Sequence, residues 1–172
     1  MIYRKRPNQQ NQLRGAVNRA QGAYFEKLIG RSCEYYRTIG TAVIEKTPEP
    51  FHITGTLPQG RFIGNFAKSA QPDFKGTLKG GRTIVFEAKY SADGKIKQDR
   101  VTKDQAAALD TYDKAGALCF VFVSLKMQHF YFLPWPVWQT MKQRYGRKYM
   151  AAADMKAYEV RFNGNIIEFL KL

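Results

Sequence analysis

Acidic side chains are scarce in this sequence. Aspartate and glutamate together number 14 against 28 lysines and arginines, so the formal net charge at pH 7 is +14. Residues 1–20 and 141–150 contain several basic side chains and no acid. This imbalance favours a polyanionic partner, nucleic acid first and an acidic membrane surface second. Charge alone selects a class of partner and does not establish an activity.

Cysteine is nearly absent, and long hydrophobic runs are missing. Cys33 and Cys119 stand far apart in the sequence and form no Cys-x-x-Cys pair, so we expect two buried thiols that act as small hydrophobes. The first residues, MIYRKRPNQQNQLRG, hold no apolar stretch and argue against a signal peptide. No segment reaches the roughly 18 apolar residues of a membrane span. We therefore expect a cytoplasmic protein without a membrane partner.

Internal repeats are also absent, and the composition suits one domain. The chain has 172 residues and 44% hydrophobic content, which is enough to bury a core. Residues 1–17 are rich in glutamine, asparagine and arginine and predict a disordered basic arm. Both a solvated tail and an arm that orders on a phosphate backbone fit that composition. Residues 18–172 are expected to form the single domain.

The first half of the chain predicts a helix, a strand and a protrusion. Apolar residues recur at three-to-four spacing from about residue 18 to 39, and Gly40 ends the pattern. Residues 41–46 are of β type. Residues 51–72 hold three glycines, two prolines, three phenylalanines, Arg61 and Lys68, and residues 51–70 are taken as the protrusion; neither range contains an acid. A segment of this length between strands is uncommon unless it is functional or disordered. We interpret it as a stalk with some β character.

The second half predicts a mixed α/β (α+β) arrangement. Residues 73–78 and 82–89 form a hairpin, and 91–100 are a basic loop. Thr102 and Gln105 have the spacing of a capping box, which begins a helix that runs to about residue 115. Residues 117–125 and 127–133 are strands, and residues 134–146 are a helix begun by prolines. The last residues fit either short strands or a terminal helix. The predicted order is α-β-β-β-α-β-β-α.

Two acids and a lysine stand out in the predicted hairpin. Period-two alternation places Glu87 and Lys89 on one face, ~7 Å apart at a rise of ~3.3 Å per residue. Whether Asp73 joins them depends on the turn, because a one-residue slip sends every side chain to the other face.

Two turns compete for this hairpin. A two-residue turn at Gly80 and Gly81 separates Asp73 from Glu87, whereas a three-residue loop at 79–81 places them opposite each other. We predict the three-residue loop, since glycine at its third position adopts the left-handed conformation that such loops need.

Adjacent carboxylates repel each other unless a cation lies between them. Mg²⁺ prefers oxygen ligands and water, so Asp73, Glu87 and the backbone carbonyl of Ala88 are candidate metal ligands. Lys89 beside the metal would orient a water and stabilise charge on a phosphate. This set suits phosphodiester hydrolysis. The alternative is an ordinary charged face of a half-exposed strand, because Glu-x-Lys is a common pattern.

These residues resemble a known superfamily. Pro72-Asp73 followed by Glu87-Ala88-Lys89 is similar to the PD-(D/E)xK nuclease motif, which sits on the α-β-β-β-α-β order of the restriction-endonuclease-like fold. Within that superfamily the chain resembles the RecU-type Holliday-junction resolvases of Gram-positive bacteria and their phages. The resemblance is carried by residues 24–51, 71–89, the Gln105 helix, 116–124 and YGRK at 145–148.

The resemblance implies a fold, an activity and partners. The fold is a mixed sheet flanked by helices with a stalk at 51–70, and the activity is junction resolution by a homodimer that needs Mg²⁺ (or Mn²⁺). Asp73, Glu87 and Lys89 match the family motif, Glu26 matches a helix glutamate near the metal, and Gln105 matches a polar residue on the second helix. We expect all five to be catalytic. For contact with four-way junction DNA we expect a basic set: Arg4, Lys5, Arg6, Arg14, Arg19, Arg61, Lys68 and Lys75.

Two other functions fit the same residues. One is a restriction or repair endonuclease of the same fold that cuts duplex DNA. The other is a basic DNA-binding protein without chemistry, which the acids at Asp73 and Glu87 disfavour because a pure binder needs no acid facing DNA. The acid-free stalk favours the junction over the duplex as substrate.

Overall fold

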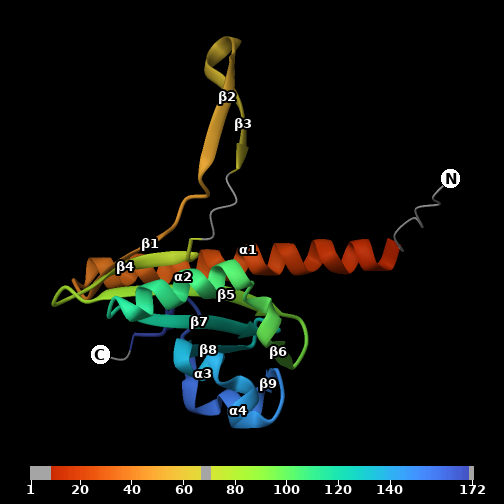
Figure 1. The fold of residues 1–172 in the computed structure, drawn as a ribbon, viewed down its shortest axis with the longest axis vertical. Helices are drawn as coiled ribbons and strands as arrows, with labels where there is room; N and C mark the ends of the chain where they lie inside the picture. The colour runs from red at the N-terminus through yellow and green to blue at the C-terminus, as the bar shows by residue number, and fades with distance from the viewer. Residues whose placement is uncertain (1–8, 67–70, 171–172) are drawn as a thin grey trace.

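A mixed sheet organises the molecule (Figure 1). The computed structural model describes residues 9–66 and 71–170. Within them the main sheet has seven strands in the order β1-β4-β5-β7-β8-β10-β11. Only β5 and β7 run parallel; the other neighbours in the sheet are antiparallel. The strands are β1 (Ala42–Lys46), β4 (Phe74–Leu78), β5 (Thr83–Ser91), β7 (Leu118–Leu125), β8 (His129–Pro134), β10 (Glu159–Phe162) and β11 (Ile167–Glu168).

The parallel pair β5 and β7 is joined by a helical crossover, α2 (Lys103–Lys114). Parallel neighbours require such a connection, because a tight turn can only reverse the chain. Without the stalk and the short strand β6 (Lys95–Lys97), the helices and strands from α1 to β7 follow the predicted α-β-β-β-α-β order. The expected fold class, a mixed sheet flanked by helices, is therefore confirmed.

The first helix, α1 (Gln9–Thr38), covers one face of the sheet. Its buried residues include Phe25, Leu28, Ile29 and Tyr36, which join the phenylalanines of β4, β5 and β7 in one core cluster. Gly40 follows the helix with φ of 69°, a conformation that few residues other than glycine adopt. The predicted helix end is confirmed.

The start of α1 differs from the prediction. Residues 9–17 are helical, so the predicted disordered arm is wrong for this part, and residues 1–8 lie outside the described residues. Good helix formers such as glutamine, leucine and arginine extend the helix back to the region just after Pro7. In Figure 1 the N-terminal half of α1 runs past the edge of the sheet, and we call it the projecting half of α1.

The opposite face of the sheet is covered by α2 and by α3 (Trp135–Gln139). Its core contains Leu109, Trp135 and Trp138 together with valines of β5 and β7. Thr102 caps α2 through the predicted capping box, which is confirmed. The predicted helix at 134–146 is two short helices, because Thr140 interrupts α3 before α4 (Met141–Tyr145).

The predicted basic loop at 91–100 contains regular structure. It holds β6 (Lys95–Lys97), which pairs with β9 (Tyr149–Ala151), and the 3₁₀ turn η2 (Gln98–Arg100). Ile96 is the buried residue of β6, so a single apolar side chain anchors this strand within an otherwise polar segment. The C-terminal region forms the 3₁₀ helix η3 (Ala152–Tyr158) and the strands β10 and β11, which settles the open alternative in favour of strands.

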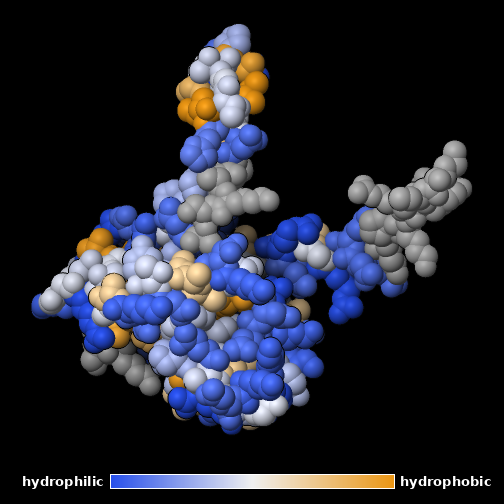
Figure 2. Space-filling model, viewed as in Figure 1, coloured by the Kyte–Doolittle hydropathy of each residue, from blue (hydrophilic) through white to orange (hydrophobic). Residues whose placement is uncertain are grey.

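The predicted stalk is an isolated hairpin. Its strands β2 (Phe51–Leu57) and β3 (Arg61–Phe66) pair only with each other among the described residues, through the turn η1 (Pro58–Gly60). Figure 1 shows the hairpin standing away from the body. Apolar side chains such as Ile53 and Phe62 are exposed on it. Figure 2 shows hydrophobic surface on the part of the hairpin that stands away from the body.

One finding concerns membranes. No helix in residues 9–66 and 71–170 combines the length and apolar character needed to cross a bilayer.

Candidate active site

The turn between β4 and β5 decides how the acids are arranged. Phe74 pairs with Phe86 and Thr77 with Thr83, and the Leu78 amide donates to the Arg82 carbonyl at 2.9 Å. The loop therefore has three residues, 79–81, as predicted. Both of its glycines have positive φ, 93° and 92°. Two residues in a row that require left-handed backbone explain why this loop needs two glycines.

This register brings Asp73 beside Glu87 on the face that α2 covers. The Ala88 amide donates to Asp73 Oδ2 at 2.8 Å, which joins the start of β4 to the middle of β5. Lys89 Nζ lies 2.8 Å from Glu87 Oε2 and 3.9 Å from Asp73 Oδ2. The lysine therefore lies between the two carboxylates, as an ion pair with each.

Gln105 contacts the same carboxylate from α2. Its Nε2 donates to Glu87 Oε2 at 2.6 Å. Its Oε1 accepts from the Thr102 amide at 3.1 Å, and its own amide donates to Thr102 Oγ1 at 3.3 Å. Because the capping box uses the oxygen of the side chain, the amide nitrogen is the end that faces Glu87. A helix cap thus fixes the orientation of a candidate active-site residue.

Glu87 is an unusual carboxylate because it has no solvent-exposed surface. Burial raises the pKa of the Glu87 carboxyl to about 7; the Lys89 ammonium opposes this shift, and the Asp73 carboxylate adds to it. Oε2 accepts from Lys89 and Gln105, whereas Oε1 is buried without a hydrogen-bond partner among the described residues. A buried carboxylate oxygen without a donor is costly, and a cation would satisfy it.

The donor set fits a hard divalent cation. Asp73 and Glu87 offer carboxylate oxygens on neighbouring strands, and the side chain of Asp73 is 28% exposed, so the site opens to solvent on that side. No cluster of three or more histidine, cysteine, aspartate or glutamate side chains occurs in the described part of the chain. A metal here would therefore rely on backbone oxygen or water for its other ligands, as Mg²⁺ commonly does.

Glu26 is not brought to the other four residues. It lies on α1, and its Oε2 is 2.7 Å from Lys46 Nζ at the end of β1. Lys46 has the same strand parity as the buried Ile44, so this ion pair lies on the α1 face, opposite to Glu87. The neighbouring Glu26 carboxylate raises the pKa of the Lys46 amine. A catalytic role for Glu26 stays a prediction.

The predicted DNA-contacting residues fall into three groups. Arg14 and Arg19 are exposed on the projecting half of α1, Arg61 is exposed on the stalk, and Lys75 is exposed on β4, where its Nζ donates to Gln71. The others lie outside the described residues: Arg4, Lys5, Arg6 and Lys68.

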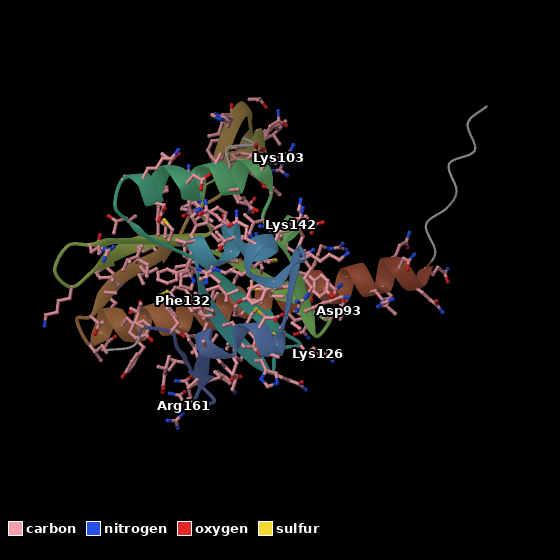
Figure 3. The ribbon with its side chains drawn as sticks, turned by 60° about the horizontal axis from the view of Figure 1, so that its bottom comes forward. Asp93, Lys103, Lys126, Phe132, Lys142 and Arg161 are labelled. Atoms are coloured by element: carbon pink, nitrogen blue, oxygen red, sulfur yellow. The ribbon has the colours of Figure 1, made fainter. Side chains whose placement is uncertain are left out.

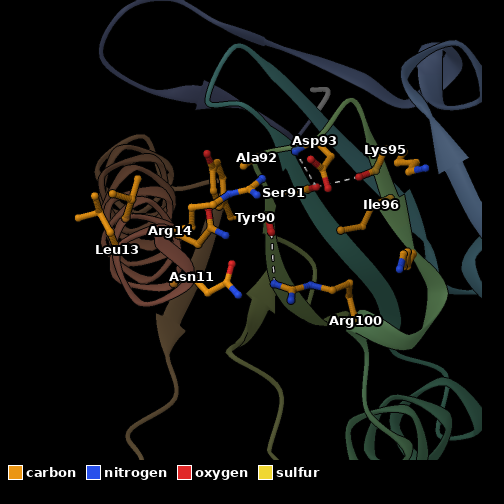
Figure 4. Close-up of a pocket in the computed structure, with 14 residues that line it drawn as sticks. Asn11, Leu13, Arg14, Tyr90, Ser91, Ala92, Asp93, Lys95, Ile96 and Arg100 are labelled. Carbon is orange, nitrogen blue, oxygen red and sulfur yellow. Dashed lines mark hydrogen bonds between the residues drawn. The ribbon is translucent and has the colours of Figure 1, made fainter. Parts of the chain in front are cut away.

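A groove of about 740 Å³ lies between the projecting half of α1 and the segment that follows β5. Figure 4 shows Arg14 on one side of it and Arg100 on the other, with Arg100 donating to the Tyr90 carbonyl at 3.4 Å. Tyr90 directly follows the site lysine in β5. In Figure 3 another exposed cation, Lys103 at the start of α2, lies on the side of the body that carries the stalk.

Sequence reasoning missed Thr47. Its amide donates to the Asp73 carbonyl at 2.9 Å, so β1 continues its pairing with β4 by one residue beyond Lys46. Its side chain is buried, and Oγ1 has no hydrogen-bond partner among the described residues. The alternation of side chains along residues 41–46 could have predicted its position. Continued to residue 47, it places Thr47 on the same face of the strand as Val43 and Glu45.

Comparisons with known proteins identify a family and several similar chains. The family model described as "Recombination protein U" matches residues 20–172. The Holliday junction resolvase RecU of Streptococcus sanguinis is 30% identical over 128 residues, which cover 70% of this chain and 64% of that relative. The corresponding protein of Pediococcus pentosaceus is 24% identical over 165 residues, covering 88% and 81%.

The chain thus matches less than two thirds of the length of the Streptococcus sanguinis relative. Among solved structures, Hjc, a Holliday junction resolvase of Archaeoglobus fulgidus, shares 14% identity with a TM-score of 0.49 and covers 78% of this chain and 92% of its own. The family model extends over nearly the whole chain, and the chain therefore belongs to the RecU family, recombination protein U.

Proposed function

We propose that this chain is a divalent-metal-dependent endonuclease that resolves four-way DNA junctions by phosphodiester hydrolysis. The observation that carries the proposal is the buried carboxylate of Glu87, beside the partly exposed carboxylate of Asp73. One oxygen of Glu87 has no hydrogen-bond partner in the part of the chain that the structure describes. Two acids at this spacing in a protein of net charge +14 suit a metal that faces a polyanion. The curated relatives that match the chain bear the name Holliday junction resolvase.

Asp73, Glu87 and the Ala88 carbonyl would hold Mg²⁺ or Mn²⁺. When bound, the metal supplies Lewis-acid stabilisation of the phosphate and lowers the pKa of a bound water. The chain's own contribution is to hold the two carboxylates in place. The Lys89 ammonium opposes the upward pKa shift of Glu87, and Gln105 holds Glu87 Oε2 at 2.6 Å.

Lys89 has a second task in this proposal. Its side chain is only 12% exposed and touches both acids, so the ammonium is held in place before DNA arrives. A positive charge fixed at this point stabilises negative charge that develops on the phosphate during hydrolysis. Pre-organisation matters because a lysine in solvent would lose conformational freedom on each turnover.

The rest of the molecule holds the DNA. The exposed cations on α1, the stalk and β4 would neutralise phosphates, and the exposed apolar residues of the stalk would contact the open centre of a junction. A four-way junction has two equivalent strands to cut, so a homodimer with two sites suits symmetric cleavage. We place this activity in the cytoplasm, where recombination intermediates of a bacterium or phage occur.

Strand cleavage of a four-way junction and of a matched linear duplex, each with Mg²⁺, tests the proposal. We expect paired nicks in the junction and an intact duplex from the wild type, and no nicks from Glu87→Gln, which should still bind the junction. Cutting of the duplex would favour the alternative function, a restriction or repair endonuclease that acts on duplex DNA. Junction binding without any cleavage would favour a non-catalytic binder.

A further inference from the structure

Two buried side-chain oxygens lack a hydrogen-bond partner in the part of the chain that the structure describes. They are Glu87 Oε1 and Thr47 Oγ1. Buried polar atoms are paired in the great majority of cases, and each exception calls for an explanation. The free oxygen of Glu87 is explained by the proposed metal. The free hydroxyl of Thr47 belongs to no site described so far.

Both oxygens come from one row of residues across three strands. Thr47 lies opposite Asp73, because its amide donates to the Asp73 carbonyl and continues the β1–β4 register. Asp73 in turn lies opposite Glu87 in the β4–β5 register. Directly opposed residues of antiparallel strands project from the same face, with Cβ atoms ~5 Å apart. Asp73 is therefore flanked on that face by Thr47 on one side and by Glu87 on the other.

Local geometry keeps the Thr47 side chain on this face. Pro48 follows it and favours extended backbone at Thr47, so the side-chain alternation of β1 continues one residue past the end of the strand at Lys46. The earlier residues of the same parity, Val43 and Glu45, are exposed, whereas Thr47 is 8% exposed. Valine has nearly the same shape as threonine and would fill this space without a buried hydroxyl that lacks a partner, which costs free energy. The chain nevertheless keeps a hydroxyl beside the acids.

We propose that the Thr47 hydroxyl hydrogen-bonds a water in the hydration shell of the divalent metal that Asp73 and Glu87 hold. This inference rests on the proposed metal-dependent function. Thr47 is thus a positioning residue, which acts through the water. Magnesium keeps several of its waters in protein sites, and a neutral hydroxyl can orient one without adding charge.

Three variants test the inference. Thr47→Val removes the hydroxyl, Thr47→Ser keeps it, and Thr77→Val makes the same change on the same face of β4 at its other end, where Thr77 is exposed. The readout is the melting temperature of the purified protein, first in a chelator and then over a titration of Mg²⁺ and of Mn²⁺. Metal that binds only the folded state raises the melting temperature in a concentration-dependent way.

We expect Thr47→Val to melt in chelator at or above the wild-type temperature, because it loses a hydroxyl without a partner. The same variant should need on the order of 10- to 100-fold more metal for the same upward shift. The Thr47→Ser and Thr77→Val variants should titrate like the wild type. A purely structural role for Thr47 would instead lower the melting temperature in chelator.

Several outcomes would overturn the inference. If the melting temperature of Thr47→Val responds to metal as that of the wild type does, Thr47 does not act at the metal site. The proposed metal-dependent function is unaffected by that result. A metal-free melting temperature well below wild type in Thr47→Val, or an equal loss of metal response in Thr47→Ser, assigns Thr47 to packing. If the wild-type protein shows no metal-dependent shift, the proposed metal site fails, and the inference fails with it.

Discussion

At the scale of single residues, the site depends on the Glu87 carboxylate, which the fold buries although a charged group is more stable in water. Glu87 lies under α2, where Lys89 and Gln105 donate to its Oε2 and no group in residues 9–66 and 71–170 donates to its Oε1. Burial raises the pKa of this carboxyl to about 7, so the metal-free site readily takes up a proton. A bound cation favours the ionised form. The burial of Glu87 therefore costs free energy, which the proposed metal would offset on binding.

The two glutamates of the predicted site should respond differently to removal of charge. We expect Glu87→Gln to abolish the metal-induced rise in melting temperature, because it removes a ligand charge. We expect Glu26→Gln to keep that rise, since Glu26 pairs with Lys46 on the other face of the sheet. Differential scanning fluorimetry with and without Mn²⁺ measures both. Loss of the metal response in Glu26→Gln would instead support the role that the family resemblance assigns to Glu26.

At the scale of elements, a helix cap, a hairpin turn and a strand end position the site. The sequence predicted the first two, because the turn and cap signals are local: Gly80 and Gly81 select a three-residue loop, and Thr102 with Gln105 forms a capping box. It did not predict the burial of Thr47, which depends on how residues far apart in the sequence pack.

Two further elements were missed, one for a local reason and one for a long-range reason. Residues 9–17 were predicted to be an arm from their polar composition, yet their intrinsic helix preference continues α1. The strand β6 depends on a partner, β9, about fifty residues later, and only Ile96 marks it locally. The grouping of Asp73, Glu87 and Lys89, the proposed catalytic residues, could be predicted because they lie on two strands joined by a short loop, where the register follows from the loop length.

The capping box should matter for stability and for chemistry together. Thr102→Ala removes the hydroxyl that accepts from Gln105 and should cost about 1 kcal/mol of unfolding free energy. It should also lower junction cleavage, because Gln105 is no longer held toward Glu87. Thr111→Ala, which removes a mid-helix hydroxyl bonded to the Ala107 carbonyl, is the matched control. Urea unfolding and a cleavage assay, run on both variants, measure the two effects. Equal cleavage by both variants would contradict this role of the cap.

The stalk should be separable from the body. Its strands pair only with each other among the described residues, so replacing residues 52–65 by a short glycine turn should leave the melting temperature of the body close to wild type. Junction cleavage should fall strongly, because the exposed apolar residues of the stalk are gone. Thermal melting and a junction-cleavage assay measure the two properties. A stalkless protein that still resolves junctions at the wild-type rate would remove the stalk from substrate recognition.

At the scale of the whole molecule, an excess of cations surrounds a small acidic site. The net charge of +14 supplies attraction to DNA, and the acids at the site are too few to offset it. Phosphate contacts release counterions, so the logarithm of the binding constant should fall linearly with the logarithm of salt concentration.

We expect Arg14→Ala to reduce the steepness of that salt dependence by about one unit, as the loss of one phosphate contact predicts. Arg161→Ala is the control, because Arg161 lies on β10, at the end of the body away from the stalk in Figure 3. Fluorescence anisotropy of a labelled junction over a range of salt measures both slopes. If the two variants change the slope equally, the projecting half of α1 has no special part in binding DNA.

The central claim, that Asp73 and Glu87 hold a metal that drives junction cleavage, is tested most directly by one paired measurement on Asp73→Asn. Nicking of a four-way junction in Mg²⁺ and binding of the same junction are recorded side by side for this variant and the wild type. Asparagine keeps an oxygen that can accept from the Ala88 amide, so the fold should be preserved. We predict wild-type binding with no nicking. Nicking at the wild-type rate, or loss of binding in parallel with loss of nicking, would contradict the claim.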